Sequence, residues 1–136
     1  MTFAWTPDLA VGVPSIDAQH QELFRRAQCL LLALADRAGE REVLHTLGFL
    51  GDYVATHFEK EERLMRARGY PELALHAYEH RRFAESFDLL RRRFASLGVD
   101  GQYLRDVERE VCEWLTHHLD FTDRALGSWL QAHGAP

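Results

Sequence analysis

Two pairs of ionisable residues on either side of a short break constrain the fold of this chain more than any other feature. His57 and Glu61 lie four residues apart before the break, and His76 and His80 have the same spacing after it. On an α-helix, residues with this spacing are about 40° apart around the axis and about 6 Å apart along it, so each pair directs two ligand atoms toward one point. The segment Gly-Tyr-Pro at residues 69–71 separates the pairs. Two helices folded back on each other there would bring all four side chains together.

Both pairs lie on apolar stripes with the periodicity of helices that face a core. The stripe before the break comprises Val43, Leu47, Leu50, Val54 and Leu64, and the stripe after it comprises Leu73, Phe83, Phe87, Leu90 and Phe94. Because a bare carboxylate is costly to bury, Glu61 must be paired, protonated or bound to a metal. A single core histidine is more often an ordinary hydrogen-bonded residue than a ligand. Several ionisable residues at successive core positions instead favour a shared site.

Turn residues and capping signals predict four amphipathic helices with short connections. The expected elements are an arm over residues 1–16 with Trp5 packed on the bundle, a first helix capped by Ser15 or Asp17, a second over residues 40–68, a third from Pro71 to about residue 96, a fourth capped by Asp100, and a short fifth helix over residues 123–133. No segment shows strand periodicity. The predicted fold is therefore all-α, an antiparallel up-down-up-down four-helix bundle with an N-terminal arm and a short C-terminal helix.

The first and fourth of these helices add histidines at core positions. The first helix carries an apolar stripe that includes Ile16 and Leu23, and His20 lies on it. The fourth helix shows Leu104, Val107, Val111 and Trp114, and its next core position is His118. Three histidines miss the stripes and are interpreted as surface residues: His45, His117 and His133.

Composition limits the classes of function. The 136 residues fit one domain, 1–136, and the 16 basic and 21 acidic residues give a net charge of −5, which argues against nucleic acid as a partner. The longest apolar run, residues 29–35, is too short to span a membrane, and the N-terminus has no basic and apolar leader. Cys29 and Cys112 form no CxxC motif and are expected to be reduced thiols. A cytoplasmic protein is the expectation.

The inward-facing candidates suit a metal site. Imidazoles with a minority of carboxylates favour iron, zinc or copper over calcium or magnesium. The candidates are His20, His57, Glu61, His76, His80, His118 and Asp123. They are too many for one metal ion and fit two, with the carboxylates used as bridges. A histidine-rich pair of irons favours reversible binding of oxygen over its activation, since neutral imidazoles stabilise high-valent iron less well than carboxylates.

The sequence resembles the bacterial hemerythrins over nearly its whole length. The motifs that carry the resemblance are Gly12-Val-Pro-Ser-Ile-Asp-Ala-Gln-His20, His57-Phe-x-x-Glu61-Glu with Leu64-Met65, Tyr70-Pro71, His76-x-x-x-His80, and Trp114-Leu-x-x-His118 followed by Asp123. Each motif alone is weak. Together, in this order and at this spacing, they are highly specific.

The resemblance implies two iron ions (Fe2+/Fe3+) joined by an oxo or hydroxo bridge. By motif position, His76, His80 and His118 would hold one iron, which is coordinatively full, and His20 and His57 would hold the other, which keeps one position open. Glu61 and Asp123 would bridge the two ions. The implied function is reversible binding of dioxygen for storage, delivery or buffering.

The neighbours of the open-site ligands on their helices are all apolar, and they are either ordinary core residues or the lining of an oxygen pocket. They are Leu23, Phe58, Trp114, Leu115 and Leu119. Two other functions stay open. One is an oxygen or redox sensor that acts through a separate soluble partner, and the other is a di-iron enzyme acting on peroxide or nitric oxide, which would need a proton donor at the open iron. A non-enzymatic monomer is expected, since no long apolar face is evident.

Asp123 is the one candidate off a helical stripe. It lies five residues after His118, which on a regular helix leaves the two side chains about 140° apart. Asp120 is no substitute, because it lies about 160° from His118 and should face solvent. The sequence therefore predicts that the fourth helix loosens, ends or takes a wide, π-type turn between His118 and Asp123, and that Gly127 helps the chain turn into its tail.

Overall fold

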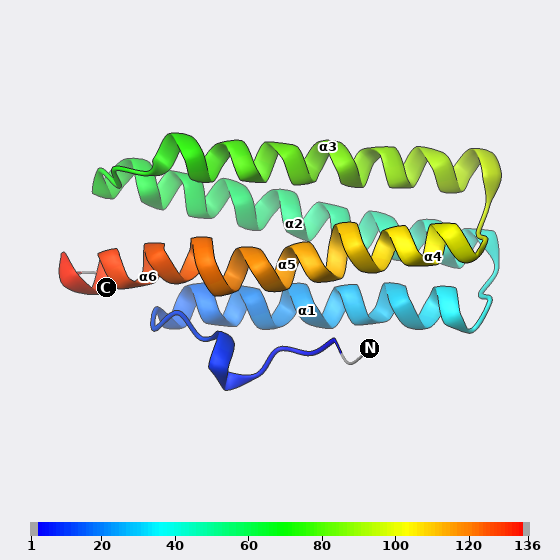
Figure 1. The fold of residues 1–136 in the computed structure, drawn as a ribbon, viewed down its shortest axis with the longest axis horizontal. Helices are drawn as coiled ribbons and strands as arrows, with labels where there is room; N and C mark the ends of the chain where they lie inside the picture. The colour runs from blue at the N-terminus through cyan, green and yellow to red at the C-terminus, as the bar shows by residue number, and fades with distance from the viewer. Residues whose placement is uncertain (1–2, 135–136) are drawn as a thin grey trace.

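The computed structural model describes residues 3–134, and four long helical segments run side by side and antiparallel in it (Figure 1). The first three segments are α1 (Pro14–Ala35), α2 (Glu40–Arg68) and α3 (Leu73–Leu97), preceded by one 3-10 turn, η1 (Pro7–Leu9). The fourth segment consists of α4 (Gly101–Val107), the π-helical η2 (Glu108–Glu113), α5 (Trp114–His117), the π-helical η3 (His118–Asp123) and α6 (Arg124–Ala132). The predicted four-helix bundle is confirmed. The C-terminal helix is not a separate element, because α6 continues the fourth segment directly.

The predicted cap of the first helix is wrong. α1 begins at Pro14, and its N-cap residue, Val13, makes no side-chain capping bond. Proline suits the first helical position because its fixed φ is helical and its missing N–H is not needed there. The Asp17 carboxylate instead accepts the backbone N–H groups of Val11 at 2.7 Å and Gly12 at 3.3 Å, which ties the arm to the helix.

The other predicted helix ends are confirmed to within two residues. Gly69 ends α2 in the left-handed conformation (φ 69°), and Tyr70 N–H donates to the Met65 carbonyl at 2.9 Å, closing the helix end. α3 begins at Leu73, two residues after the predicted start at Pro71. Asp100 caps the fourth segment as predicted, accepting the Tyr103 N–H at 2.7 Å.

Two apolar clusters form the core, with the ionisable residues between them. The larger cluster includes Leu23 and Phe83, and the smaller one includes Ile16 and Met65. On each helical segment, the candidate ligands lie between residues of the two clusters. Core packing therefore shields the site from both ends of the bundle.

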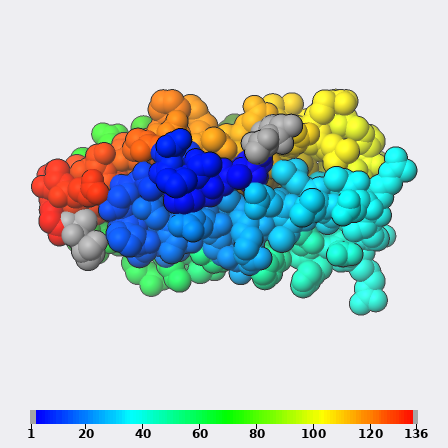
Figure 2. Space-filling view, turned by 90° about the horizontal axis from the view of Figure 1, so that it is seen from below, coloured from blue at the N-terminus to red at the C-terminus, as the bar shows by residue number. Residues whose placement is uncertain are grey.

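The N-terminal arm closes one side of the bundle, where it lies along α1 and beside the fourth segment (Figure 2). Trp5 is partly buried against the larger cluster, as predicted. Gly127 does not make a turn, contrary to the prediction. It lies within α6, and a Cβ there would be 2.3 Å from the Val11 carbonyl oxygen, so glycine is needed for the arm to approach the helix. Among the described residues, no helix has the length and apolar character needed to cross a membrane.

Candidate metal centre

All seven predicted ligands are buried, and every helical segment contributes at least one. Their relative exposure is 2% or less: His20 on α1, His57 and Glu61 on α2, His76 and His80 on α3, and His118 and Asp123 at the two ends of η3. The first three segments direct their ligands inward through the regular spacing of an α-helix.

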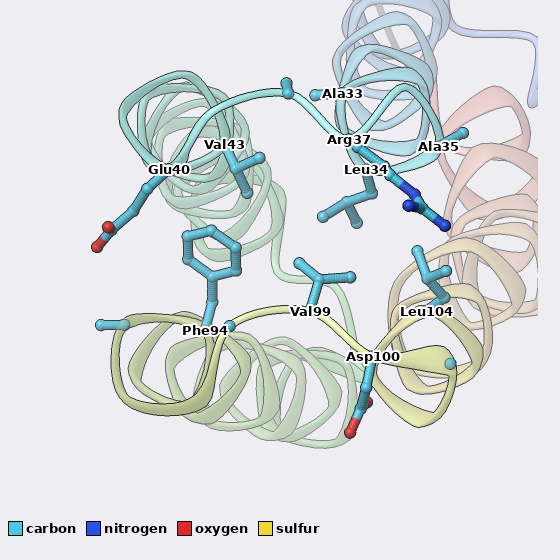
Figure 3. A pocket seen from close by; sticks show the side chains of 14 residues that line it. Ala33, Leu34, Ala35, Arg37, Glu40, Val43, Phe94, Val99, Asp100 and Leu104 are labelled. Carbon is cyan, nitrogen blue, oxygen red and sulfur yellow. The ribbon is translucent and has the colours of Figure 1, made fainter.

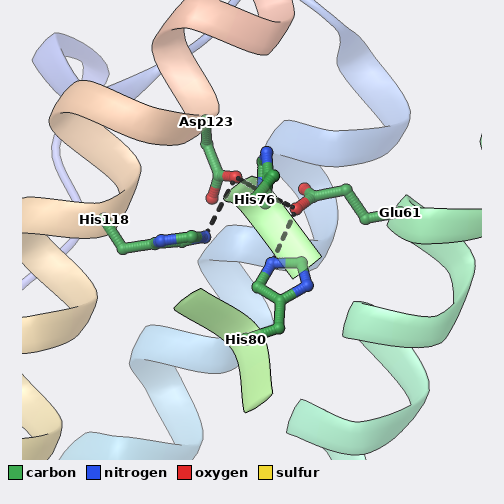
Figure 4. A group of neighbouring side chains, drawn as sticks. All are labelled: Glu61, His76, His80, His118 and Asp123. Carbon is green, nitrogen blue, oxygen red and sulfur yellow. Dashed lines mark ion pairs between the residues drawn. The ribbon is translucent and has the colours of Figure 1, made fainter. Parts of the chain in front are cut away.

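The seven residues form two overlapping groups whose ligand atoms lie within 4.8 Å of one another. The five-residue group consists of Glu61, His76, His80, His118 and Asp123 (Figure 4). The four-residue group consists of His20, His57, Glu61 and Asp123. The two carboxylates belong to both groups, so each group keeps its own histidines, three in one and two in the other.

Glu61 turns one oxygen toward each group. Its Oε1 is 2.8 Å from His76 Nε2 and 3.2 Å from His80 Nε2, both in the five-residue group. Its Oε2 is 3.4 Å from His57 Nε2 and 3.8 Å from His20 Nε2, both in the four-residue group. This is the orientation that a bridging carboxylate requires.

Asp123 is oriented in the same way from the opposite side of the bundle. Its Oδ1 lies 3.0 Å from His76 Nε2 and 3.3 Å from His118 Nε2, and its Oδ2 lies 3.0 Å from His20 Nε2. Two carboxylates thus face the same pair of points, with the imidazole Nε2 atoms around them.

The inward atoms make few hydrogen bonds with one another, although they lie close together. The buried side-chain atoms without a hydrogen-bond partner include both oxygens of Glu61 and Asp123, both nitrogens of His20 and His76, and Nε2 of His80 and His118. A buried polar group left unpaired costs about 1 to 3 kcal/mol. So many convergent lone pairs fit a pair of metal ions, which would satisfy them together.

The wide turn predicted before Asp123 is confirmed. Residues 118–123 form the π-helical η3, and Asp123 is fully buried at its end. Asp120 faces outward and pairs with Arg124 at 2.9 Å. The second π-helical stretch, η2, was not predicted. It shifts the core register of the fourth segment, so that Leu115 is fully buried while Trp114 is only half-buried.

Comparisons with known proteins agree with this geometry. The model of the hemerythrin HHE cation binding domain matches residues 11–130. The chain belongs to the hemerythrin family. It is 32% identical over 132 residues to the bacteriohemerythrin of Stenotrophomonas maltophilia (strain R551-3), covering 95% of this chain and 82% of the relative.

Other members of the hemerythrin family are similar over the same length. The bacteriohemerythrin of Methylococcus capsulatus (strain ATCC 33009 / NCIMB 11132 / Bath) is 30% identical over 129 residues, covering 94% of this chain and 96% of the relative. A crystal structure of wild-type hemerythrin superposes with a TM-score of 0.79 at 29% sequence identity, covering 94% of this chain and 95% of that one. The predicted resemblance to bacterial hemerythrins is therefore confirmed.

Three imidazoles of the metal-free site, those of His20, His76 and His118, have raised pKa values. Burial lowers the pKa of His20, but the carboxylates of Asp123 and Glu61 outweigh it and raise the pKa to about 9. The same opposition raises the pKa of His76 to about 10 and that of His118 to about 9. Burial raises the pKa of both carboxyls, and the Glu61 carboxylate also raises that of Asp123, yet the facing imidazoles lower each pKa well below its usual value. Metal ions must therefore displace protons when they bind.

Three polar residues behind the imidazoles were missed from the sequence. Three Nδ1 atoms donate away from the centre: His57 to Gln19 Oε1 at 2.6 Å, His80 to Glu62 Oε2 at 2.8 Å, and His118 to Glu79 Oε1 at 2.9 Å. These bonds fix the tautomer that leaves Nε2 free for a metal ion. The only sequence signal is that each acceptor adjoins a ligand in the chain, as Gln19 precedes His20.

The five predicted pocket residues belong to the larger apolar cluster or pack against it. Leu23, Phe58, Leu115 and Leu119 are buried, and Trp114 is half-buried. The Phe58 ring stacks on His80 with centroids 3.7 Å apart, and the Trp114 ring stacks on His118 at 4.5 Å. Both rings thus contact the five-residue group. That these residues line an oxygen pocket stays a prediction.

The remaining histidines and an open surface pocket lie away from the candidate ligands. His45, His117 and His133 are exposed, as predicted. An open pocket of about 910 Å³ lies at the far end of the bundle, where the loops after α1 and α3 meet (Figure 3). Its lining includes Leu34, Phe94 and none of the candidate ligands.

Proposed function

We propose that the protein binds dioxygen reversibly at a non-haem di-iron centre. The proposed ligands are His76, His80 and His118 for one iron, His20 and His57 for the other, and Glu61 and Asp123 as bridges. The observation that carries this proposal is that each buried carboxylate turns one oxygen toward each histidine group. When bound, the iron pair with its oxo or hydroxo bridge would supply the redox chemistry, one electron from each ion.

The unequal groups support an open coordination position. The five-residue group contains three histidines and the four-residue group contains two, although both share the same carboxylates. The second iron is therefore one protein ligand short of the first. That deficit provides the position for dioxygen on the side of His20 and His57.

The surroundings support binding without further reaction. Within residues 3–134, the buried carboxylates and imidazoles are the seven ligands and Asp106, and Asp106 pairs with Arg93 at 2.6 Å. Beyond the ligands themselves, these residues therefore offer no buried carboxyl or imidazole that could donate a proton to bound oxygen. The apolar neighbours of the cluster exclude water and slow the proton entry that would convert bound oxygen irreversibly. On this ground we favour a binding protein over an enzyme.

We further propose that the chain acts as one domain and as a monomer. Its large exposed apolar side chains are spread over α1, α2, α3 and the fourth segment, among them Leu32 on α1 and Leu89 on α3. The two free cysteines, Cys29 and Cys112, suit a reducing compartment such as the cytoplasm.

Metal analysis and anaerobic spectroscopy test the function. We expect two irons per chain and, on addition of oxygen to the reduced protein, an iron charge-transfer band that disappears under vacuum. His118→Ala should abolish the band, whereas His117→Ala, at the exposed neighbouring position, should leave it intact. One zinc per chain, or a band that does not reverse, would disprove the proposal.

A further inference from the structure

Two of the three imidazoles of the five-residue group have a carboxylate behind them, whereas Nδ1 of the third, His76, is buried without a partner among the described residues. His80 donates its Nδ1–H to the Glu62 carboxylate at 2.8 Å, and His118 donates to the Glu79 carboxylate at 2.9 Å. Glu79 also accepts the Thr122 hydroxyl at 2.8 Å, so a side chain within η3 holds the carboxylate in place. The Glu62 and Glu79 side chains are 25% and 31% exposed, which lets both stay ionised without losing contact with the imidazoles.

The four-residue group has no such charge behind its rings. His57 donates its Nδ1–H to the neutral amide oxygen of Gln19 at 2.6 Å. Nδ1 of His20 is buried and has no partner among the described residues. The two halves of the site therefore differ by two negative charges just beyond the imidazoles.

This difference bears on the oxidation state of each metal ion. A carboxylate that accepts the Nδ1–H of a ligand imidazole makes Nε2 a stronger electron donor. Negative charge near a metal also stabilises its higher oxidation state by simple electrostatics. A neutral amide fixes the orientation of the ring but adds no net charge.

We propose that Glu62 and Glu79 make the iron of the five-residue group the first of the pair to be oxidised and the last to be reduced. Gln19, being neutral, leaves the iron of the four-residue group ferrous over a wider range of potential. Each ion exchanges one electron, so the half-oxidised pair carries its single ferric ion in the five-residue group. The iron with the open position is thereby protected from stray one-electron oxidants. This inference rests on the proposed di-iron function.

Charge-removing variants separate this role from simple positioning. Glu62→Gln and Glu79→Gln keep an oxygen acceptor for the imidazole but remove its charge. Gln19→Glu adds a charge behind His57. The matched control is Glu59→Gln, which removes a carboxylate from the same helix as Glu62, where it is 68% exposed and pairs with Arg63.

The measurements are iron content and the two one-electron potentials, obtained by dye-mediated anaerobic titration. Each glutamine variant should keep two irons and raise the lower of the two reduction potentials by about 59 mV. This shift corresponds to a tenfold change in the equilibrium constant of that one-electron step. Gln19→Glu should lower the higher potential. In all three variants the two potentials should lie closer together, so the half-oxidised pair should be less populated and its paramagnetic signal weaker. Glu59→Gln should leave this signal unchanged.

The possible outcomes separate this inference from the proposed di-iron function on which it rests. If wild type binds two irons and oxygen reversibly but the variants keep the potentials of Glu59→Gln, the inference is wrong and the function stands. Loss of iron from the glutamine variants would mean that the carboxylates only position the rings, which also overturns it. A wild-type protein without two irons overturns both proposals.

Discussion

Replacing Asp123 with asparagine tests the carboxylate that η3 brings into the cluster. Asp123 places Oδ1 at 3.0 Å from His76 Nε2 and Oδ2 at 3.0 Å from His20 Nε2. Asparagine keeps one oxygen, but an amide NH2 group occupies the other position and cannot bind a cation. One iron should therefore lose a ligand, and the pair should lose one negative charge.

The expected magnitude follows from the ligand count. Removing a residue that only supports a ligand weakens metal binding about 10- to 100-fold, so loss of a bridging oxygen should cost at least about 100-fold. A factor of 100 in affinity corresponds to about 2.7 kcal/mol of the stability that bound iron contributes. At about 4 °C per kcal/mol for a domain of this size, the Tm of the iron-loaded protein should fall by about 10 °C.

Asp120→Asn is the matched control on the same turn. The Asp120 side chain is 46% exposed and pairs with Arg124, an interaction worth less than about 1 kcal/mol. The assay is iron content after dialysis against a chelator, together with calorimetric melting of both iron-loaded variants. If Asp123→Asn retains two irons and has the same Tm as Asp120→Asn, the Asp123 carboxylate does not bridge the irons. Glu61 would then be the one bridging carboxylate among the proposed ligands.

Three further predictions concern the ligands and their surroundings. His57→Ala removes one of the two histidines of the four-residue group, so metal analysis should find about one iron per chain; two irons would exclude His57 as a ligand. Leu119→Ser should admit water and protons, so stopped-flow spectra should show faster autoxidation at unchanged iron content, and an adduct as durable as wild type would make Leu119 a plain core residue. In the iron-free protein, the raised pKa values of His20, His76 and His118 add stability below their ordinary pKa of 6.5, and this is lost as the pH rises toward 9 to 10. The lowered pKa values of the two carboxyls add stability above their ordinary values of 3.8 and 4.5, and this is lost in acid. Urea unfolding should therefore find the iron-free protein most stable between about pH 4.5 and 6.5, whereas a flat alkaline profile would contradict the protonated cluster.

The sequence by itself determined the bundle and the candidate ligands. Helical hydrogen bonds join residues four apart, so the helical periodicity is a local property of the chain. The spacing of His57 and Glu61 therefore already places both side chains on one face. The same local geometry predicted a wide turn before Asp123, since no regular helix could align it with His118. The first helix start was mispredicted because Pro14 initiates the helix without the side-chain cap that Ser15 or Asp17 would supply.

Only the tertiary structure decided which groups from different segments meet. Glu79 reaches His118 on the fourth segment, a pairing set by how the helices pack rather than by any local pattern. The same holds for Gly127, whose role emerges from the approach of the arm at Val11. The direction of each carboxylate oxygen toward one histidine group likewise depends on all four segments together. Local spacing thus determines which residues face the core, whereas packing determines what each of them contacts there.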